Sequence, residues 1–425
     1  MFVIYNILQL LALSILGPVL MLFGLASAKY RRRIPRRLGV GLAGMVSGLP
    51  PGPRVWIHAL SVGEMASVRP LLELLRQEMP EAVIIVSATT GSGEDYARRL
   101  GRLVDCVIPF PFDGYWVVAR FVKLVRPDLF VLVETDFWPN LLWCLNQQGV
   151  RCLLVNGRVT QRSMAWYRKF HFLFTPLFTS FWRISMQMAD DATRLMQLGV
   201  EPGKIVVCGN LKYDMAGRRS VAAEPFDLGG FDSEQGLLLV AGSTHPGEEQ
   251  MMLDVFASLL PKYRTLSLII APRDVRRASE LAGRCARLGL SCSLRTMPCE
   301  ASCQVLILDT LGELALVYGL ADIAFVGGSL IDHGGHNPLE PAFYSVPVLF
   351  GPYMSDFAEI SQALLDAGGA QMVTPDTLPA VVDELLARDS LRQQMGRFAG
   401  ALVLKHRGAA RCFLGLIRDA LSNVR

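Results

Sequence analysis

The stretch Val326-Gly-Gly-Ser-Leu-Ile-Asp-His-Gly-Gly-His-Asn-Pro-Leu-Glu-Pro341 decides the fold of the second half of this chain. It passes from an apolar strand pattern through glycines at positions 327, 328, 334 and 335 into a helix that we expect to begin near Pro338. Glycines remove side chains where a ligand touches the main chain, and a helix N-terminus offers free N–H groups to a phosphate. The stretch therefore predicts a nucleotide site, and a tight loop that serves packing alone is the alternative interpretation.

Polar side chains inside this stretch bear on what it binds. Asn337 is suited to cap the helix, Pro338 fits its first turn, and Glu340 is placed to accept hydrogen bonds from ribose hydroxyls. His333 and His336 are potential metal ligands, but no third ligand recurs at a usable spacing. We therefore predict a nucleotide site without a metal ion and without any other cofactor.

On both sides of this stretch, short apolar and β-branched runs alternate with helical patterns, which predicts βαβ units and a doubly wound parallel sheet in each half of the chain. Two such domains facing a cleft place functional loops at the carboxyl ends of their strands. The expected helices include residues 65–79, 94–100 and 115–125. The expected strands are 55–58, 82–86, 129–133 and 152–155 in the first half and 236–241, 266–270, 305–308, 323–326 and 346–350 in the second.

Composition excludes several classes of protein. The chain has 425 residues, of which 51% are hydrophobic and 19% charged, so it can bury more than one core and is not disordered. A net charge of +4 without a basic block after the first 40 or so residues gives no reason to expect a nucleic-acid partner. Nine scattered cysteines without a CxxC pair predict free, buried thiols rather than a disulfide framework or a zinc site. Walker A, GxGxxG and GxSxG motifs are absent.

The N-terminus carries no charged residue from position 2 to 28, a length of roughly 40 Å as a helix, and a basic cluster follows at 29–37. This pattern predicts a membrane-anchor helix with the remainder of the chain on the cytoplasmic side. A cleaved signal peptide is disfavoured because no basic residue precedes the apolar stretch. A helix that lies in one leaflet, bent at Gly17 and Pro18, is a third interpretation that the sequence leaves open.

Two carboxylates and a lysine in the first half are candidates for chemistry. Glu64 follows a strand at the mouth of a helix, where partial burial would raise its pKa toward that of a useful general base. Glu134 also follows a strand, and Lys212 precedes the inter-domain linker, where a cation would meet a departing phosphate. The alternative roles are a first-turn glutamate favoured by the helix dipole, a cap of the next helix, and an ordinary exposed lysine.

Taken together, these motifs resemble the 3-deoxy-D-manno-octulosonic acid (Kdo) transferase family, in order and over nearly the whole chain. The stretches that carry the resemblance are Ser61-Val-Gly-Glu64, Glu134-Thr-Asp-Phe-Trp-Pro139, Asn156-Gly-Arg158, Gly209-Asn-Leu-Lys212, Pro272-Arg273, Gly312-Glu313 and Gly334-Gly-His-Asn-Pro-Leu-Glu340. This sequence departs from the family pattern at Asp274, where a histidine is common, and at Leu311, where a methionine is common.

The resemblance implies a GT-B glycosyltransferase fold, with two Rossmann-like domains facing a cleft after the N-terminal membrane-anchor helix. It implies CMP-Kdo as donor, a lipid A precursor as acceptor, and inversion at the transferred sugar. Glu64 matches the family's proton acceptor, and Glu134 and Lys212 match positions that stabilise the transition state. The donor-binding positions carried over are Pro272, Arg273, Leu311, Gly312, Glu313, Asn337, Pro338, Leu339 and Glu340.

Together with the apolar N-terminus, the resemblance implies an enzyme at the inner membrane whose catalytic domains face the cytoplasm. Anionic lipids are a further expected partner. The stretch 158–182 mixes basic and aromatic residues and is expected either to face that membrane or to pack on the first sheet. Another GT-B glycosyltransferase, a GT-B-like sugar epimerase and a non-enzymatic nucleotide-sugar-binding protein remain as alternatives. The expected segments are an anchor helix at 1–28, a basic juxtamembrane segment at 29–49, an acceptor domain at 50–213, a linker at 214–235, a nucleotide-sugar domain at 236–400 and a C-terminal helix at 401–425 that packs back on the first domain.

Overall fold

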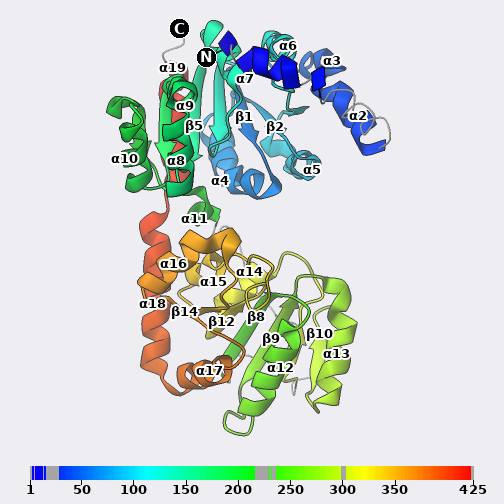
Figure 1. The fold of residues 1–425 in the computed structure, drawn as a ribbon. Helices are drawn as coiled ribbons and strands as arrows, with labels where there is room; N and C mark the ends of the chain where they lie inside the picture. Colours follow the sequence, from blue (N-terminus) through cyan, green and yellow to red (C-terminus); the bar gives the residue numbers. More distant parts are fainter. Residues whose placement is uncertain are drawn as a thin grey trace. The chain divides into compact units, whose positions relative to one another are not determined.

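The computed structural model describes residues 2–3, 5–12, 14–15, 28–215, 228, 231, 236–297 and 303–422. The chain divides into two compact units, each built around its own parallel sheet (Figure 1). Unit 1 comprises Met1–Met215 together with Arg407–Arg425, and unit 2 comprises Ala216–His406. The expected linker at 214–235 lies largely outside the described residues.

Unit 1 contains a seven-stranded sheet in the order β3-β2-β1-β4-β5-β6-β7, and every neighbouring pair is parallel. The central strands are buried on both faces, because Trp56 and Phe130 point into one core while Ile57 and Val131 point into the other. The strands are β1 (Arg54–Ala59), β2 (Val83–Ala88), β3 (Cys106–Pro109), β4 (Leu129–Val133), β5 (Arg151–Gly157), β6 (Arg183–Met186) and β7 (Ile205–Val207).

Helices cover both faces of this sheet. One core joins the sheet to α6 and α7, and the other joins it to α4 and to α19, the last helix of the chain. Figure 1 shows α19 beside the first-half elements although the whole of unit 2 separates it from them in the sequence. The helices of unit 1 are α2 (Ala28–Arg37), α3 (Leu42–Val46), α4 (Val62–Glu78), α5 (Gly91–Arg99), α6 (Tyr115–Val125), α7 (Pro139–Gln147), α8 (Gln161–Lys169), α9 (His171–Thr179), α10 (Ala189–Gln197), α11 (Leu211–Met215) and α19 (Ala409–Ser422).

The attachment of α19 corrects two expectations. Cys208 and Cys412 form a disulfide across a sequence separation of 204 residues, so the prediction that all cysteines are free thiols is wrong. The Asp214 carboxylate accepts hydrogen bonds from the N–H groups of Gly408 and Ala410, both at 2.7 Å, and so holds the start of α19. The expected boundary at residue 401 falls inside α18 (Asp389–His406), and the chain enters unit 1 again only at residue 407.

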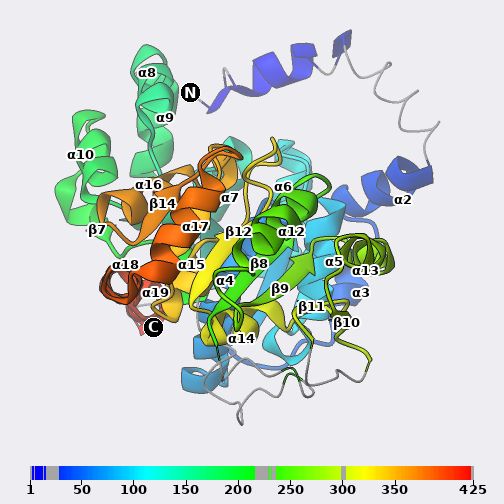
Figure 2. The same cartoon turned by 90° about the horizontal axis from the view of Figure 1, so that it is seen from below.

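Unit 2 repeats the architecture with a parallel sheet in the order β10-β11-β9-β8-β12-β13-β14. In Figure 2, α12 and α13 lie over β8, β9 and β11, which they contact. Its strands are β8 (Leu238–Thr244), β9 (Ser267–Pro272), β10 (Cys292–Leu294), β11 (Val305–Ile307), β12 (Ile323–Val326), β13 (Val348–Phe350) and β14 (Ala370–Met372). Its helices are α12 (Glu248–Leu259), α13 (Ala278–Arg287), α14 (Leu314–Val317), α15 (Leu339–Phe343), α16 (Ala358–Asp366), α17 (Leu378–Ala387) and α18.

The N-terminal segment does not support the prediction of a spanning anchor at 1–28. Among the described residues, none of the helices combines the length and the apolar composition that spanning a bilayer requires. The helical residues between 2 and 15 have a polar side, from which Tyr5 donates to the Asp113 carboxylate at 2.9 Å and Asn6 to the Asn140 side chain at 2.8 Å. Residues 16–27 lie outside the described part. The exposed apolar side chains of this segment are Val3, Ile7, Leu8, Leu10, Leu11 and Ile15.

The basic cluster that follows is partly used within unit 1. Arg33 and Arg36 lie 3.8 and 3.3 Å from the buried Glu94 carboxylate, and Arg37 donates to the Phe110 carbonyl at 2.9 Å. Arg31 and Arg32 are exposed. The expected juxtamembrane segment therefore begins with a helix, α2, that is fastened to the first domain, because a buried carboxylate requires a cationic partner.

Candidate functional site

Glu64 lies in the first turn of α4, immediately after β1, and takes part in a capping box. The Ser61 hydroxyl accepts the Glu64 N–H at 3.3 Å and donates to the Glu64 carboxylate at 3.2 Å. The same carboxylate accepts the Leu60 N–H at 2.6 Å. Glu64 is therefore a first-turn glutamate, as the alternative interpretation expects, and these hydrogen bonds also fix the direction of its carboxyl group.

The Glu64 carboxyl group is poised to exchange protons near neutral pH. Partial burial, followed by the negative charge of Glu134, raises the pKa of Glu64 to about 7, although the hydrogen bonds from Leu60 and Ser61 act in the opposite direction. Asp136 adds a smaller contribution that also raises this pKa. A carboxylate with such a pKa can take a proton from a hydroxyl group and return it to water at pH 7.

Glu134 follows β4 and has a left-handed backbone conformation, with a φ of 62°, which residues other than glycine rarely adopt. Its N–H donates to the Val155 carbonyl at 2.9 Å, and its carboxylate accepts from the Asn156 amide at 3.3 Å. The alternative role as a cap of the next helix is wrong, because α7 begins at Pro139 with Trp138 at the capping position. A strained residue held by its neighbours at a strand end is typical of a functional position.

Asn156 connects the candidate residues, and no role was predicted for it. It is fully buried, also has a left-handed backbone with a φ of 56°, and bonds to Glu134 on one side. On the other side its side-chain oxygen Oδ1 accepts the Leu211 N–H at 3.0 Å, at the start of α11. In the sequence, Asn156 stood out only as part of the Asn156-Gly-Arg158 stretch at the end of an apolar strand, one of the stretches that carry the family resemblance.

Lys212 lies on α11, which packs against α4, the helix that carries Glu64. Its N–H donates to the Asn210 side chain at 2.9 Å, and Asn210 donates in turn to Gln187 at 2.7 Å. Glu64, Glu134, Asn156 and Lys212 thus follow, or lie at, the carboxyl ends of β1, β4, β5 and β7, respectively. The carboxyl ends of the central strands are where open parallel sheets bind their ligands.

The loop after β4 ties this site to the aromatic stretch at 158–182. Phe137 has ring contacts with Tyr167, Phe174 and Phe178, so these side chains pack inward as the packing interpretation expects. Trp166 and Phe172 instead are each 56% exposed. The packing interpretation is therefore confirmed for the inward side chains, and contact of Trp166 and Phe172 with a membrane stays a prediction.

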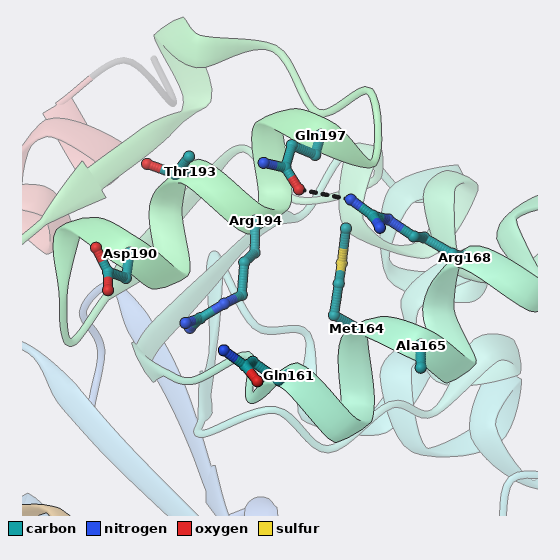
Figure 3. A pocket seen from close by; sticks show the side chains of 8 residues that line it. All are labelled: Gln161, Met164, Ala165, Arg168, Asp190, Thr193, Arg194 and Gln197. Atoms are coloured by element: carbon teal, nitrogen blue, oxygen red, sulfur yellow. Dashed lines mark hydrogen bonds between the residues drawn. The ribbon is translucent and has the colours of Figure 1, made fainter.

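Two hollows open between α8, α9 and α10. Figure 3 shows the first, of about 390 Å³, in which Arg168 donates to Gln197 at 2.7 Å. The second, of about 580 Å³, shares Arg168 and Gln197 and adds apolar side chains such as Phe172 and Leu198. None of the predicted catalytic or donor-binding residues lines either hollow.

The predicted donor residues all lie in unit 2. Pro272 ends β9, and the N–H of Arg273 donates to the Thr244 carbonyl at 2.9 Å, which joins the ends of β8 and β9. α15 begins one residue later than expected: Pro338 occupies the capping position, and Asn337 accepts the Leu339 N–H at 3.1 Å. The Asn337 amide also approaches the Glu340 carboxylate at 3.5 Å.

The residues just before α14 are held by hydrogen bonds to the Glu313 side chain. Leu311 is 80% exposed, and Gly312 has a φ of 93° that favours glycine. The Glu313 carboxylate accepts from Arg295 at 3.3 Å and from the Thr310 hydroxyl. The hydrogen bonds of Glu313 therefore hold the main chain at 311–313 in place, and its contact with a nucleotide stays a prediction. The described part of the chain holds no group of three or more His, Cys, Asp or Glu side chains arranged to bind a metal ion.

Comparisons with known proteins show which sequences and folds this chain is similar to. Residues 32–215 match a family described as 3-deoxy-D-manno-octulosonic-acid transferase (kdotransferase). A 3-deoxy-D-manno-octulosonic acid transferase of Haemophilus influenzae is 33% identical over 420 residues, which cover 96% of this chain and 97% of the relative.

Two solved structures resemble most of the chain. A putative UDP-N-acetylglucosamine 2-epimerase from Listeria monocytogenes is similar with a TM-score of 0.58 at 13% identity, over 88% of this chain and 97% of that one. MurG from Acinetobacter baumannii is similar with a TM-score of 0.53 at 14% identity, over 87% of this chain and 100% of that one. At such identities the likeness shows the fold alone, which is GT-B.

Proposed function

Because the chain belongs to the 3-deoxy-D-manno-octulosonic acid (Kdo) transferase family, we propose that it moves Kdo from CMP-Kdo to a lipid A precursor with inversion at the anomeric carbon. The observation that carries this proposal is the Glu64 carboxyl group, which a capping box fixes at a strand end and whose pKa lies at about 7. An inverting transfer requires one base of this kind. We place acceptor activation in unit 1 and the donor nucleotide in unit 2.

In the proposed reaction, Glu64 accepts the proton of an acceptor hydroxyl group as the oxygen attacks the anomeric carbon of Kdo. A new C–O bond forms on one face of the sugar, while the bond to the phosphate oxygen breaks on the other and CMP leaves. The negative charge of Glu134 supports this step, since it raises the pKa of Glu64 and thereby its basicity. Asn156 holds Glu134 and the start of α11 in place. We assign transition-state stabilisation to Glu134 and Lys212.

The donor nucleotide is assigned to the residues around the β8, β9 and β12 ends of unit 2. Arg273 supplies a positive charge, and the segments 311–313 and 337–340 supply main-chain and polar side-chain partners. The leaving group carries a single phosphate. A monophosphate requires less charge neutralisation than a diphosphate, so side chains suffice.

The test of the proposed function is a donor and acceptor assay. The protein is incubated with CMP-Kdo and a lipid A precursor, and the masses of the products are read together with the release of CMP. We expect one or more Kdo additions to the precursor and no consumption of UDP-sugars. Consumption of a UDP-sugar instead would support the alternative of a GT-B sugar epimerase or a different glycosyltransferase.

Metal independence is a direct consequence of the assignment. We expect a metal chelator to leave the rate of Kdo transfer unchanged within about twofold, because positive side chains rather than a divalent ion meet the phosphate. The measurement is CMP release with and without EDTA. Loss of activity in EDTA that added magnesium ion restores would refute this expectation.

We further propose that unit 1 binds the surface of a membrane that contains anionic lipids. The N-terminal helical residues bury their polar side on the domain and expose Ile7, Leu10 and Leu11, which supports a helix lying in one leaflet over a spanning one. Arg31 and Arg32, further along the chain, are exposed as well. Exposed basic residues near apolar side chains are suited to acidic headgroups.

The α8–α9 region offers a sharper test of membrane binding. Trp166 is exposed, and Lys169 lies over its ring at 5.7 Å. Replacing Trp166 by Ser together with Lys169 by Ala is expected to weaken sedimentation with anionic liposomes by about threefold or more. The matched control is the adjacent exposed pair Leu404 and Lys405 in unit 2, changed to Ser and Ala. Equal losses from both double variants would contradict a specific role for α8.

A further inference from the structure

Three histidines gather at the carboxyl ends of two central strands in unit 2. His245 follows β8, and His333 and His336 belong to the loop after β12. The Nε2 atoms of His245 and His336 lie 2.9 Å apart, and the ring of His245 stacks on that of His333 with centroids 4.4 Å apart. β8 pairs with β9 on one side and with β12 on the other. The strands before and after this point are added to the sheet in opposite directions, so the histidines lie where the strand order reverses. Open parallel sheets bind ligands at this point.

A buried carboxylate holds the two histidine-bearing loops together. Glu248, in the first turn of α12, is fully buried and accepts four main-chain N–H groups. One comes from His245 at 2.9 Å, and the others come from Gly328, Ser329 and Leu330 at 2.7, 2.9 and 2.9 Å. Its charge is therefore satisfied by the protein, and the loops after β8 and β12 are fixed relative to each other.

The loop after β12 depends on glycine at this site. Gly328 has a φ of 67°, and a Cβ atom there would lie 3.1 Å from the His336 ring. A residue with a side chain would adopt this backbone only under strain and would displace the imidazole. The glycine pair at 327 and 328 thus allows His336 to reach His245.

The surroundings of the histidine pair favour the neutral imidazoles in the ligand-free chain. Burial comes first and lowers the pKa of His336 to about 4, and the positive charge of Arg273 and the two other histidines add to this effect. Burial also lowers the pKa of His245, supported by His333, Arg273 and Arg277 and opposed by Glu248. In a neutral pair at 2.9 Å, one ring donates its N–H to the bare nitrogen of the other.

This contact would change if an anion entered. When the accepting nitrogen binds a proton, two N–H groups face each other, and they require an acceptor between or beside them. A phosphate oxygen supplies that acceptor, and its negative charge raises the pKa of the imidazoles. Arg273, on the neighbouring strand end, contributes a permanent charge for the same anion.

We propose that His245 and His336, with Arg273, form an anion subsite that takes up a proton from solvent when the phosphate of the cytidine nucleotide binds. This inference rests on the proposed function, which supplies the nucleotide. The chemistry suits a leaving group, because the phosphate of the donor is a diester with one negative charge and becomes a monoester with two once the bond to the sugar breaks. The proton on the histidine pair offsets the second charge.

The test is proton uptake on binding of CMP to the full-length wild-type protein. Calorimetric titrations at about pH 7.5, where the phosphate is mainly a dianion, are run in buffers of different ionisation enthalpy with EDTA present. We expect the uptake of about one proton per CMP bound. Cytidine, which lacks the phosphate, is expected to bind without proton uptake.

Variants assign the proton to the histidine pair. His336→Gln and His245→Asn, each checked for wild-type thermal unfolding, are expected to lose most of the proton uptake and to weaken CMP binding by about tenfold or more. His171→Gln, an exposed histidine on α9 in unit 1, serves as the control that retains both. The variants also correct for any proton taken up by the phosphate itself.

The outcomes separate this inference from the proposed function. If wild-type protein binds CMP without taking up a proton, or if both variants keep the uptake and the affinity, the subsite is wrong while the donor assignment stands. If wild-type protein does not bind CMP at all, the donor assignment fails and the subsite fails with it. Proton uptake by the wild-type protein on CMP binding tests the subsite even where a variant does not fold.

Discussion

Replacing Glu64 by Gln is expected to lower kcat for Kdo transfer by about 100-fold or more, because the amide cannot accept the proton of the acceptor hydroxyl. CMP binding should persist, since the donor residues lie in unit 2. Glutamine also serves in a capping box, so its side-chain oxygen can still accept the Leu60 N–H. The loss of turnover would therefore report chemistry rather than unfolding. The measurement is steady-state transfer together with CMP titration.

The control for this variant is Glu73→Gln, on the exposed side of the same helix, where Glu73 pairs with Arg69 at 2.8 Å. It should retain full turnover. Near wild-type turnover in Glu64→Gln would refute the assignment of the base. A loss of both turnover and CMP binding, together with a lower Tm, would show damage to the fold instead.

The wild-type pH profile follows from the same residue. The base must be ionised, so kcat/KM is expected to fall about tenfold per pH unit below about pH 7. The folded-state pKa of Glu64 is raised above the unfolded value, so the folded chain binds more protons between these two values. Ionisation of Glu64 therefore lowers stability as pH rises through this window. Glu64→Gln removes that effect and should not lower the Tm at about pH 8.

Replacing Glu134 by Gln is expected to have two separable effects. Turnover should fall by about 100-fold, since a charge assigned to the transition state is removed. The acidic limb of the kcat/KM profile should also move to lower pH, because the Glu134 charge raises the pKa of Glu64. The Asn156 amide can still donate to the new side chain, so the loop keeps its anchor.

Asp136→Asn is the matched control for this second variant. Asp136 makes the smallest contribution to the raised pKa of Glu64, and its carboxylate accepts from Trp138 at 2.9 Å. It should move the acidic limb by less than Glu134→Gln does. If the acidic limb of the kcat/KM profile stays in place in Glu134→Gln, the electrostatic coupling between Glu134 and Glu64 is contradicted. Unchanged turnover in this variant would contradict the transition-state role of Glu134.

The strands of both sheets were predictable wherever they are central. Residues 129–133 were expected as a strand and form β4, and 323–326 form β12, because buried parallel strands read as continuous apolar runs. The strands that escaped prediction lie at or next to the edges of the sheets, namely β3, β6, β7, β10 and β14. Such segments are half covered by neighbours and carry little pattern of their own.

Several predictions failed because they concern partners that are distant in sequence. Cys208 and Cys412 were expected to be free, yet the return of α19 to unit 1 brings them together. The apolar N-terminus suggested an anchor that spans the membrane, but its few polar residues, such as Tyr5, find partners on unit 1. Hydropathy summed along a segment does not show which side of a helix faces a protein.

The sequence by itself determined the two parallel α/β halves, the strand–glycine–helix loop at 326–341, and the identity of Glu64, Glu134 and Lys212 as candidates, because these features follow from local periodicity and from the order of motifs. Only the tertiary structure decided that Asn156 joins Glu134 to α11 and that Glu248 locks the loops bearing His245 and His336. It also decided that Glu64 has a pKa of about 7. Burial and charge proximity set such values, and both depend on residues that approach only after the chain has folded.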